Sequence, residues 1–469
     1  MENVKSIETV NSGEWFDANS VDEKPTFLSK IIFILLPVIF ILATIAYGAV
    51  DPWALGLLSF GAGLLAILWF LDSFFKKQFS FNTNLLQIPI VGLILIGIIQ
   101  ILPIASSPVS SDLLSIPAAN TLSLDPNTTR MAIITLIIYL IFFGASLTFI
   151  NSQSRYRTMV FTVIVFGSFM AFLGIIQFLS GTESIYGLRP NSGTSPFASY
   201  ANKHHFAALM EMIVGLTLSL LYGEATKKDK RLLLVIAVLL MGVCVLLTSS
   251  RGGLLSLLAV VAFVTLFNLI GRKSRHRESG KSTNKFLIIG ASVTLILVLL
   301  GFALFLGAGT DLKRGTGMTT MEDVSTGRFH FWSIALQSIK DHPIIGTGLD
   351  TFGTIFTKHD TWNGSLRVEQ AHNDYLQILS DAGILGFLCL AAFIILLFKK
   401  SLSIINQTSD KFHRGVAIGA LAGCFGILFH SFFDFPLRTP SNPFIFLTLV
   451  VLAVSTVNYP KLQRKSRNG

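Results

Sequence analysis

The chain has 469 residues, of which 52% are hydrophobic and only 13% are charged, and its mean hydropathy is +0.66. Soluble domains carry about 25% charged residues, so this chain has too few charges to cover a surface that faces water. A soluble nucleic-acid-binding protein, a secreted disulfide domain and a disordered protein are therefore excluded, although the formal net charge is +10.

Twelve apolar runs approach the length of about 20 residues that a membrane-spanning helix needs. They predict an all-α integral membrane protein with a polytopic domain at residues 31–457, a polar segment at 1–30 and a basic tail at 458–469. The first two runs are nearly continuous and predict a tight helical hairpin. The runs cover residues 31–50, 52–71, 85–104, 131–150, 158–179, 204–222, 232–248, 253–270, 286–308, 382–398, 415–433 and 443–457.

Positive charges in the connecting segments predict the topology. If the N-terminus is cytoplasmic and the segments alternate, 25 of the 36 Lys and Arg residues lie on the cytoplasmic side. This excess follows the positive-inside rule, so we expect both termini in the cytoplasm.

The longest outer segment, residues 309–381, is predicted to contain two short helices. The first covers residues 328–341, which present one apolar face, and a preceding Ser or Thr is expected to cap it. Glycines at both ends of the 346–348 sequence predict a flexible turn. The second helix is expected to start near Ala371 and to end near Gly383.

Two arginines on the predicted outer face are candidate anion-binding residues. Arg251 lies in a Ser-Ser-Arg-Gly-Gly turn, and its guanidinium is suited to bidentate contact with phosphate. The alternative is an arginine that reaches lipid headgroups. Arg328 opens the predicted loop helix and would share its N-terminus with a bound anion. The alternative there is a surface arginine stacked on Trp332 or Phe331.

Several imidazoles lie on the same predicted face. His372 is a candidate general base, and the alternative is a polar cluster in which Asn373 or Asp374 caps the following helix. His204 and His205 are adjacent, so they point to different helix faces and do not suggest a metal site. No metal ion and no cofactor are therefore expected.

Two further polar elements complete the outer set. Arg189 precedes the stretch that leads into the His pair. His430 and Asp434 are four residues apart, so they are expected to share a helical face and either to line a cavity or to pair with each other. The positive-inside rule drives arginines to the opposite face, so the collection of these elements on one face favours a functional site there.

Five motifs follow one another along the chain: Asn-Lys-His-His-Phe-Ala at 202–207, Ser-Ser-Arg-Gly-Gly at 249–253, Gly-Arg-Phe-His-Phe-Trp at 327–332, Gly-Thr-Gly at 346–348 and His-Asn-Asp-Tyr-Leu at 372–376. In this order the motifs resemble the bacterial O-antigen ligase and polymerase superfamily over about residues 190–440. The resemblance implies a twelve-helix, metal-independent enzyme that transfers a glycan from undecaprenyl diphosphate at the periplasmic face of the bacterial inner membrane. Attack opposite the leaving group would invert the anomeric centre.

The resemblance also implies roles for single residues. The implied catalytic residues are His372, Arg251 and Arg328. The residues expected to bind substrate are Asn202, His204, His205, Arg189, Trp332, Asn373, Tyr375 and His430.

The acceptor remains open at this point. A ligase uses lipid A core, a polymerase uses another glycan, and an oligosaccharyltransferase uses a protein hydroxyl. Beyond these substrates we expect membrane lipids as the surroundings and no nucleic acid. An exporter of polysaccharide is the competing class, but exporters show related halves with broken helices at mid-membrane depth, and this sequence shows no such pairing.

Overall fold

The computed structural model describes residues 25–104, 120–182, 184–190, 196–223, 225–275, 327–362 and 367–456, with isolated positions at 290, 293, 294, 297 and 301. Within these residues the regular secondary structure is helical, apart from two isolated β-bridges. Nine of the described helices are long and apolar enough to cross a membrane. The predicted run 286–308 and the tail at 458–469 fall almost wholly outside the described residues.

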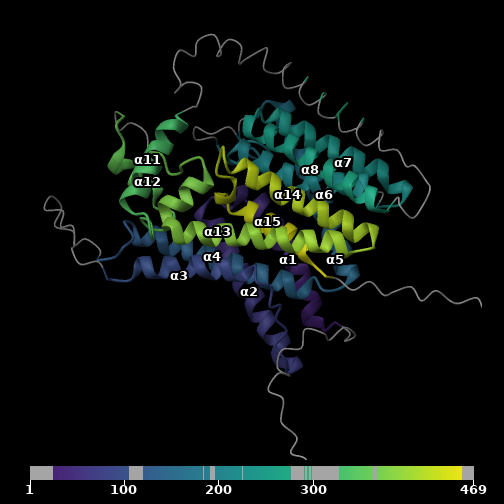
Figure 1. The fold of residues 1–469 in the computed structure, drawn as a ribbon, viewed down its shortest axis with the longest axis horizontal. Helices are drawn as coiled ribbons and strands as arrows, with labels where there is room; N and C mark the ends of the chain where they lie inside the picture. Colours follow the sequence, from purple (N-terminus) through teal and green to yellow (C-terminus); the bar gives the residue numbers. More distant parts are fainter. Residues whose placement is uncertain are drawn as a thin grey trace, which may run out of the picture.

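The helices follow the predicted apolar runs in chain order, and eleven of the runs coincide with a helix (Figure 1). The nine long helices are α1 (Phe27–Ile45), α2 (Pro52–Lys76), α4 (Pro126–Phe149), α5 (Gln153–Ser180), α6 (Lys203–Tyr222), α7 (Lys228–Leu247), α8 (Arg251–Arg275), α13 (Asp374–Gln407) and α14 (Lys411–His430). The shorter elements are η2 (Tyr47–Ala49), α3 (Gln87–Ile101), α11 (Arg328–Asp341), α12 (Phe352–His359), η3 (Pro436–Arg438) and α15 (Ser441–Val454).

Local sequence explains several helix ends. The side chains of Ser152, Asn373 and Asp410 each accept a hydrogen bond from a backbone N–H in the first turn of α5, α13 and α14. Pro52 and Pro126 stand at the first positions of α2 and α4, where the missing N–H costs no intrahelical hydrogen bond.

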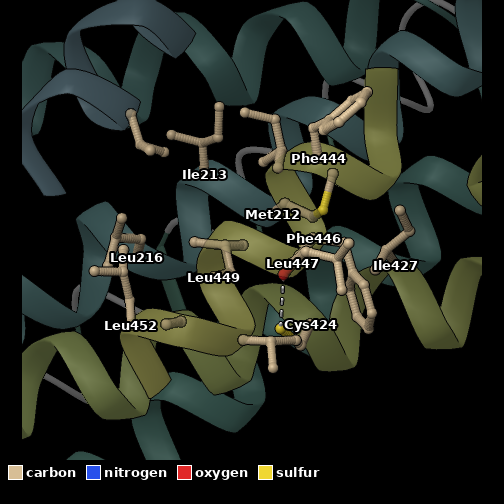
Figure 2. Close-up of a cluster of buried hydrophobic side chains, with 14 of the residues drawn as sticks. Met212, Ile213, Leu216, Cys424, Ile427, Phe444, Phe446, Leu447, Leu449 and Leu452 are labelled. Atoms are coloured by element: carbon tan, nitrogen blue, oxygen red, sulfur yellow. Dashed lines mark hydrogen bonds between the residues drawn. The ribbon is translucent and has the colours of Figure 1, made fainter. Parts of the chain in front are cut away.

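The centre of the bundle is the contact between α6 and α14. Within the apolar stretches of these two helices, 94% and 83% of the residues are buried. Glycines bring the two backbones together. A Cβ on Gly215 would lie 2.8 Å from the backbone nitrogen of Gly423, and one on Gly419 would lie 2.7 Å from the Cα of Leu216. Close backbone packing of this kind holds helices together in lipid, where the hydrophobic effect does not drive them together. Side chains of α15, including Phe444, fill the adjoining space (Figure 2).

The described part of residues 309–381 has a small apolar core of its own, formed mainly by α11 and α12. These two helices lie beside the N-terminal end of α13 (Figure 1). The helix predicted at 328–341 is confirmed. Its predicted Ser or Thr cap is wrong, because Gly327, with φ of 79°, occupies the N-cap position and has no side chain to accept a hydrogen bond.

The turn at Gly346 and Gly348 packs directly against the backbone of α13. Both glycines have positive φ, and a Cβ on Gly346 would overlap the backbone of Asp381. The N–H of Thr347 donates to the carbonyl of Ser380 at 3.0 Å. The turn was predicted, but its predicted flexibility is wrong, because these contacts pack it tightly. Gly383, with φ of 62°, breaks α13 where the second short helix was expected to end.

Candidate active site

His372 and Asp434 form a hydrogen-bonded pair at the end of the bundle where α13 begins and α14 ends. His372 Nδ1 lies 3.0 Å from Asp434 Oδ1, and the two side chains are 29% and 2% exposed. Burial alone would raise the pKa of Asp434, but the hydrogen bond from His372 and the electrostatic effect of the His205 and His372 rings outweigh it and hold that pKa well below its ordinary value. An ionised Asp434 places the ring proton of His372 on Nδ1, so Nε2 is left as a base.

The backbone around His372 is fixed against the end of α14. His372 itself has φ of 52°, a conformation that non-glycine residues rarely adopt. The Nδ2 of Asn373 donates to the carbonyl of Phe432 at 3.1 Å, and the N–H of Asp374 donates to the carbonyl of Ser431 at 3.0 Å. The expectation that Asn373 or Asp374 caps the helix is confirmed for Asn373.

A buried carboxylate that the sequence analysis missed lies beneath the site. His430 Nδ1 is 3.1 Å from Glu211 Oε1, and these side chains are 1% and 0% exposed. His430 pairs with Glu211 and Asp434 pairs with His372, so the direct pair, one of the two alternatives predicted for His430 and Asp434, is wrong. The available signal was a carboxylate inside the apolar run 204–222, where an ionisable group is expensive unless it is paired.

Arg251 is exposed and is the first residue of α8. The two glycines that follow it let the start of this helix pack closely against its neighbours. A Cβ on Gly252 would lie 3.0 Å from Nε2 of His430, and one on Gly253 would lie 2.8 Å from the Cβ of Ala207. The glycines therefore allow α8 to approach α6 and α14 closely. This contact determines the position of Arg251, because Arg251 is the residue directly before Gly252.

The adjacent imidazoles of α6 diverge, as predicted. His204 Nδ1 lies 2.9 Å from Oγ of Ser250, whereas His205 Nδ1 is hydrogen-bonded to the hydroxyl of Thr439 and its Nε2 lies 3.3 Å from Nδ2 of Asn202. In the part of the chain that the structure describes, His, Cys, Asp and Glu form no group of three or more with the arrangement of a metal site.

Helix α11 brings Arg328 to the same end of the bundle. Arg328 is half-buried and lies close enough to His204 for its charge to act on that ring. The ring of Phe331 lies 5.7 Å from that of His372, centroid to centroid. Trp332 is half-buried and packs edge-on against Phe329 at 5.7 Å. The start of α11 is therefore adjacent to both imidazoles.

Two predicted site residues have other partners. Arg189 pairs with Asp51 at 2.9 Å and lies over the ring of Tyr47, so the structure does not bring it to His372. The hydroxyl of Tyr375 donates to the carbonyl of Leu428 at 2.6 Å and joins α13 to α14.

Arg438 is a further residue that the sequence analysis missed. Its guanidinium lies 2.8 Å from Asp350 and 3.0 Å from Asp381, and its Nε lies 3.8 Å from Asp374. Burial works to lower the pKa of Arg438, but the three carboxylates outweigh this effect and raise the pKa above its ordinary value. This arginine therefore ties the Gly-Thr-Gly turn and the start of α13 to the segment that carries Asp434.

Residues 236–391 match the family model described as O-antigen ligase. The match runs from α7 into α13 and includes Arg251, Arg328 and His372, so the resemblance to this superfamily is confirmed over these residues. No curated protein matches the chain. The family match and the apolar helices support a multi-pass membrane protein that processes glycans.

Proposed function

From the O-antigen ligase region of this chain, we propose that the protein transfers a glycan from undecaprenyl diphosphate to an acceptor hydroxyl at the outer face of the bacterial inner membrane. One observation carries the proposal. The imidazole of His372, oriented by Asp434 at 3.0 Å, lies beside the start of α11, where Arg328 is placed.

The reaction requires a base. The acceptor oxygen attacks the anomeric carbon of the donor sugar, a new carbon–oxygen bond forms, and the acceptor proton passes to Nε2 of His372. The imidazolium that results is stabilised by the carboxylate of Asp434. Attack from the side opposite the leaving group inverts the anomeric centre.

The reaction also requires stabilisation of a leaving group. The bond between the anomeric carbon and the diphosphate oxygen breaks, and its electron pair leaves with the diphosphate. Guanidinium groups aimed at this oxygen bind the transition state more tightly than the ground state, because the negative charge is still growing. Arg251 and Arg328 are proposed for this task, and the proposal needs no metal ion and no cofactor.

The proposed location of the reaction follows from the charge distribution. The excess of basic residues on the predicted inner side, 25 of 36, supports a topology with both termini in the cytoplasm and the site on the periplasmic side. A donor on a membrane lipid suits this face, because soluble sugar nucleotides stay in the cytoplasm.

Deletion of the gene tests the proposal and identifies the acceptor. If lipid A core is the acceptor, long chains disappear from lipid A on gels while polymer on the lipid carrier remains intact. Single-repeat products on lipid A would identify a polymerase, whose acceptor is another glycan. Unchanged surface and carrier-linked glycans would contradict the proposed function.

Complementation of the deletion adds a matched pair of variants. The His372→Ala protein should fail to restore the long chains. The His359→Ala protein should restore them, because His359 ends α12 and its ring pairs only distantly with Asp341, at 3.7 Å. Equal restoration by the two variants would remove His372 from the reaction.

A further inference from the structure

The two adjacent imidazoles of α6 differ in how many of their nitrogens the protein uses. His205 is 4% exposed, and both of its ring nitrogens have partners, in Thr439 and Asn202. Its backbone carbonyl also accepts a hydrogen bond from Asn442 at 3.1 Å. The ring of His205 therefore has no nitrogen left for a ligand, and it acts to join α6 to the segment before α15.

His204 uses only one ring nitrogen within the described residues. Ser250 Oγ lies 2.9 Å from Nδ1 of His204 and accepts the N–H of Gly253 at 3.1 Å. Among the described residues the Ser250 hydroxyl has no other acceptor, so we assign its hydrogen to Nδ1, and with this assignment the ring proton of His204 is on Nε2. No described residue bonds to Nε2, so this N–H is a donor that a ligand can use.

Charged groups of both signs act on the ring that carries this donor. Ser250, which His204 contacts, immediately precedes Arg251 in the chain, and the charges of Arg328 and Lys203 act on the His204 ring. The carboxylate of Asp434 acts on it as well, but that carboxylate is hydrogen-bonded to His372. The N-termini of α6 and α8 also meet here, and helix N-termini favour anions.

We propose that His204, and not His205, binds the diphosphate of the donor together with Arg251 and Arg328, through a hydrogen bond from Nε2–H to a phosphate oxygen. This inference rests on the proposed function. When the bond between the sugar and the diphosphate breaks, the phosphate oxygen gains charge and the hydrogen bond strengthens. The proton stays on Nε2, because a diphosphate leaving group does not need it.

Two substitutions at one position separate this proposal from a structural contact with Ser250. His204→Asn keeps an amide near the position of Nδ1 and removes the group at the position of Nε2. His204→Gln places an amide N–H near the position of Nε2. We expect kcat to fall about 100-fold in the Asn variant, the scale of one lost oxyanion donor, and to stay within about tenfold of wild type in the Gln variant.

The assay uses the purified full-length protein with a lipid-linked donor and an acceptor glycan. Inhibition by undecaprenyl diphosphate should weaken in the Asn variant, whereas inhibition by undecaprenol, which has no phosphate, should not change. The His359→Gln protein serves as the control, with wild-type kcat expected, and thermal melting verifies that each variant is folded.

The reverse order, with the Asn variant active and the Gln variant impaired, would assign His204 to the contact with Ser250 and overturn the inference. Equal, near-normal turnover of both variants would overturn it as well. An inactive wild-type protein would instead refute the proposed function itself, so the two failures are distinguishable.

Discussion

Replacement of Asp434 by Asn tests whether the His372–Asp434 pair drives the reaction. The substitution preserves the size of the side chain and a possible hydrogen bond, but it removes a charge that is 2% exposed and 3.0 Å from His372 Nδ1. In the wild type this charge orients the ring and stabilises the imidazolium that forms when the acceptor loses its proton.

The magnitude follows from the geometry. Two unit charges 3.0 Å apart attract each other by about 5.5 kcal/mol at an effective dielectric constant of about 20. This value is an upper bound, because the His372 side chain is 29% exposed and the amide retains part of the interaction. We therefore expect kcat to fall about 10²- to 10⁴-fold, with a smaller change in donor affinity.

The assay follows the transfer of glycan to the acceptor on gels, with purified protein and saturating donor. Stability is measured in parallel. Because folding lowers the pKa of Asp434, its charge stabilises the folded protein above the ordinary pKa range of Asp. The melting-temperature difference between wild type and Asp434→Asn should therefore be full at neutral pH and shrink as the pH falls below about 4. Turnover of the Asn variant within threefold of wild type would refute the proposed role of the pair.

Three other predictions concern the surroundings of the site. Arg251→Lys and Arg328→Lys should each lower kcat about 10²- to 10³-fold and leave the melting temperature nearly unchanged, because Lys lacks the planar fork; full activity would reduce both to headgroup contacts. In a cysteine-free background, an impermeant thiol reagent applied to cells with a permeabilised outer membrane should label Lys358→Cys and not Lys230→Cys, and labelling at the second position would overturn the topology. Arg438→Met should destabilise the protein by about 3 kcal/mol in thermal or denaturant unfolding, because it leaves buried carboxylates unpaired; an unchanged melting temperature would contradict this.

Helix positions were largely predictable because lipid leaves a strong signal in the sequence. A spanning helix must satisfy its backbone internally and present apolar side chains, so the apolar runs coincide with helices. The ends were less predictable. Helix α13 continues to Gln407, beyond the predicted end at 398, because Lys399 and Lys400 interrupt the apolar run without breaking the helical hydrogen bonds.

The site was predictable as a set of residues but not as a set of contacts. His372, Arg251 and Arg328 were identified from local motifs, each of which spans only a few consecutive residues. The partner of His372 is 62 positions away and the partner of His430 is 219 positions away, so both depend on how α14 packs against the rest of the bundle. The alternative in which His430 pairs with Asp434 rested on their spacing of four residues, which carries no information about the distant partners Glu211 and His372.

The most direct test of the proposed mechanism is transfer by the purified protein from a glycan on undecaprenyl diphosphate to an acceptor glycan, measured in excess EDTA for wild type and for His372→Ala. We predict that the wild type transfers the glycan at an undiminished rate with the chelator present. His372→Ala should bind the donor with nearly normal affinity and transfer nothing measurable. Loss of wild-type transfer on chelation, or near-normal turnover of His372→Ala, would contradict the mechanism in which an imidazole base and two arginines perform the reaction.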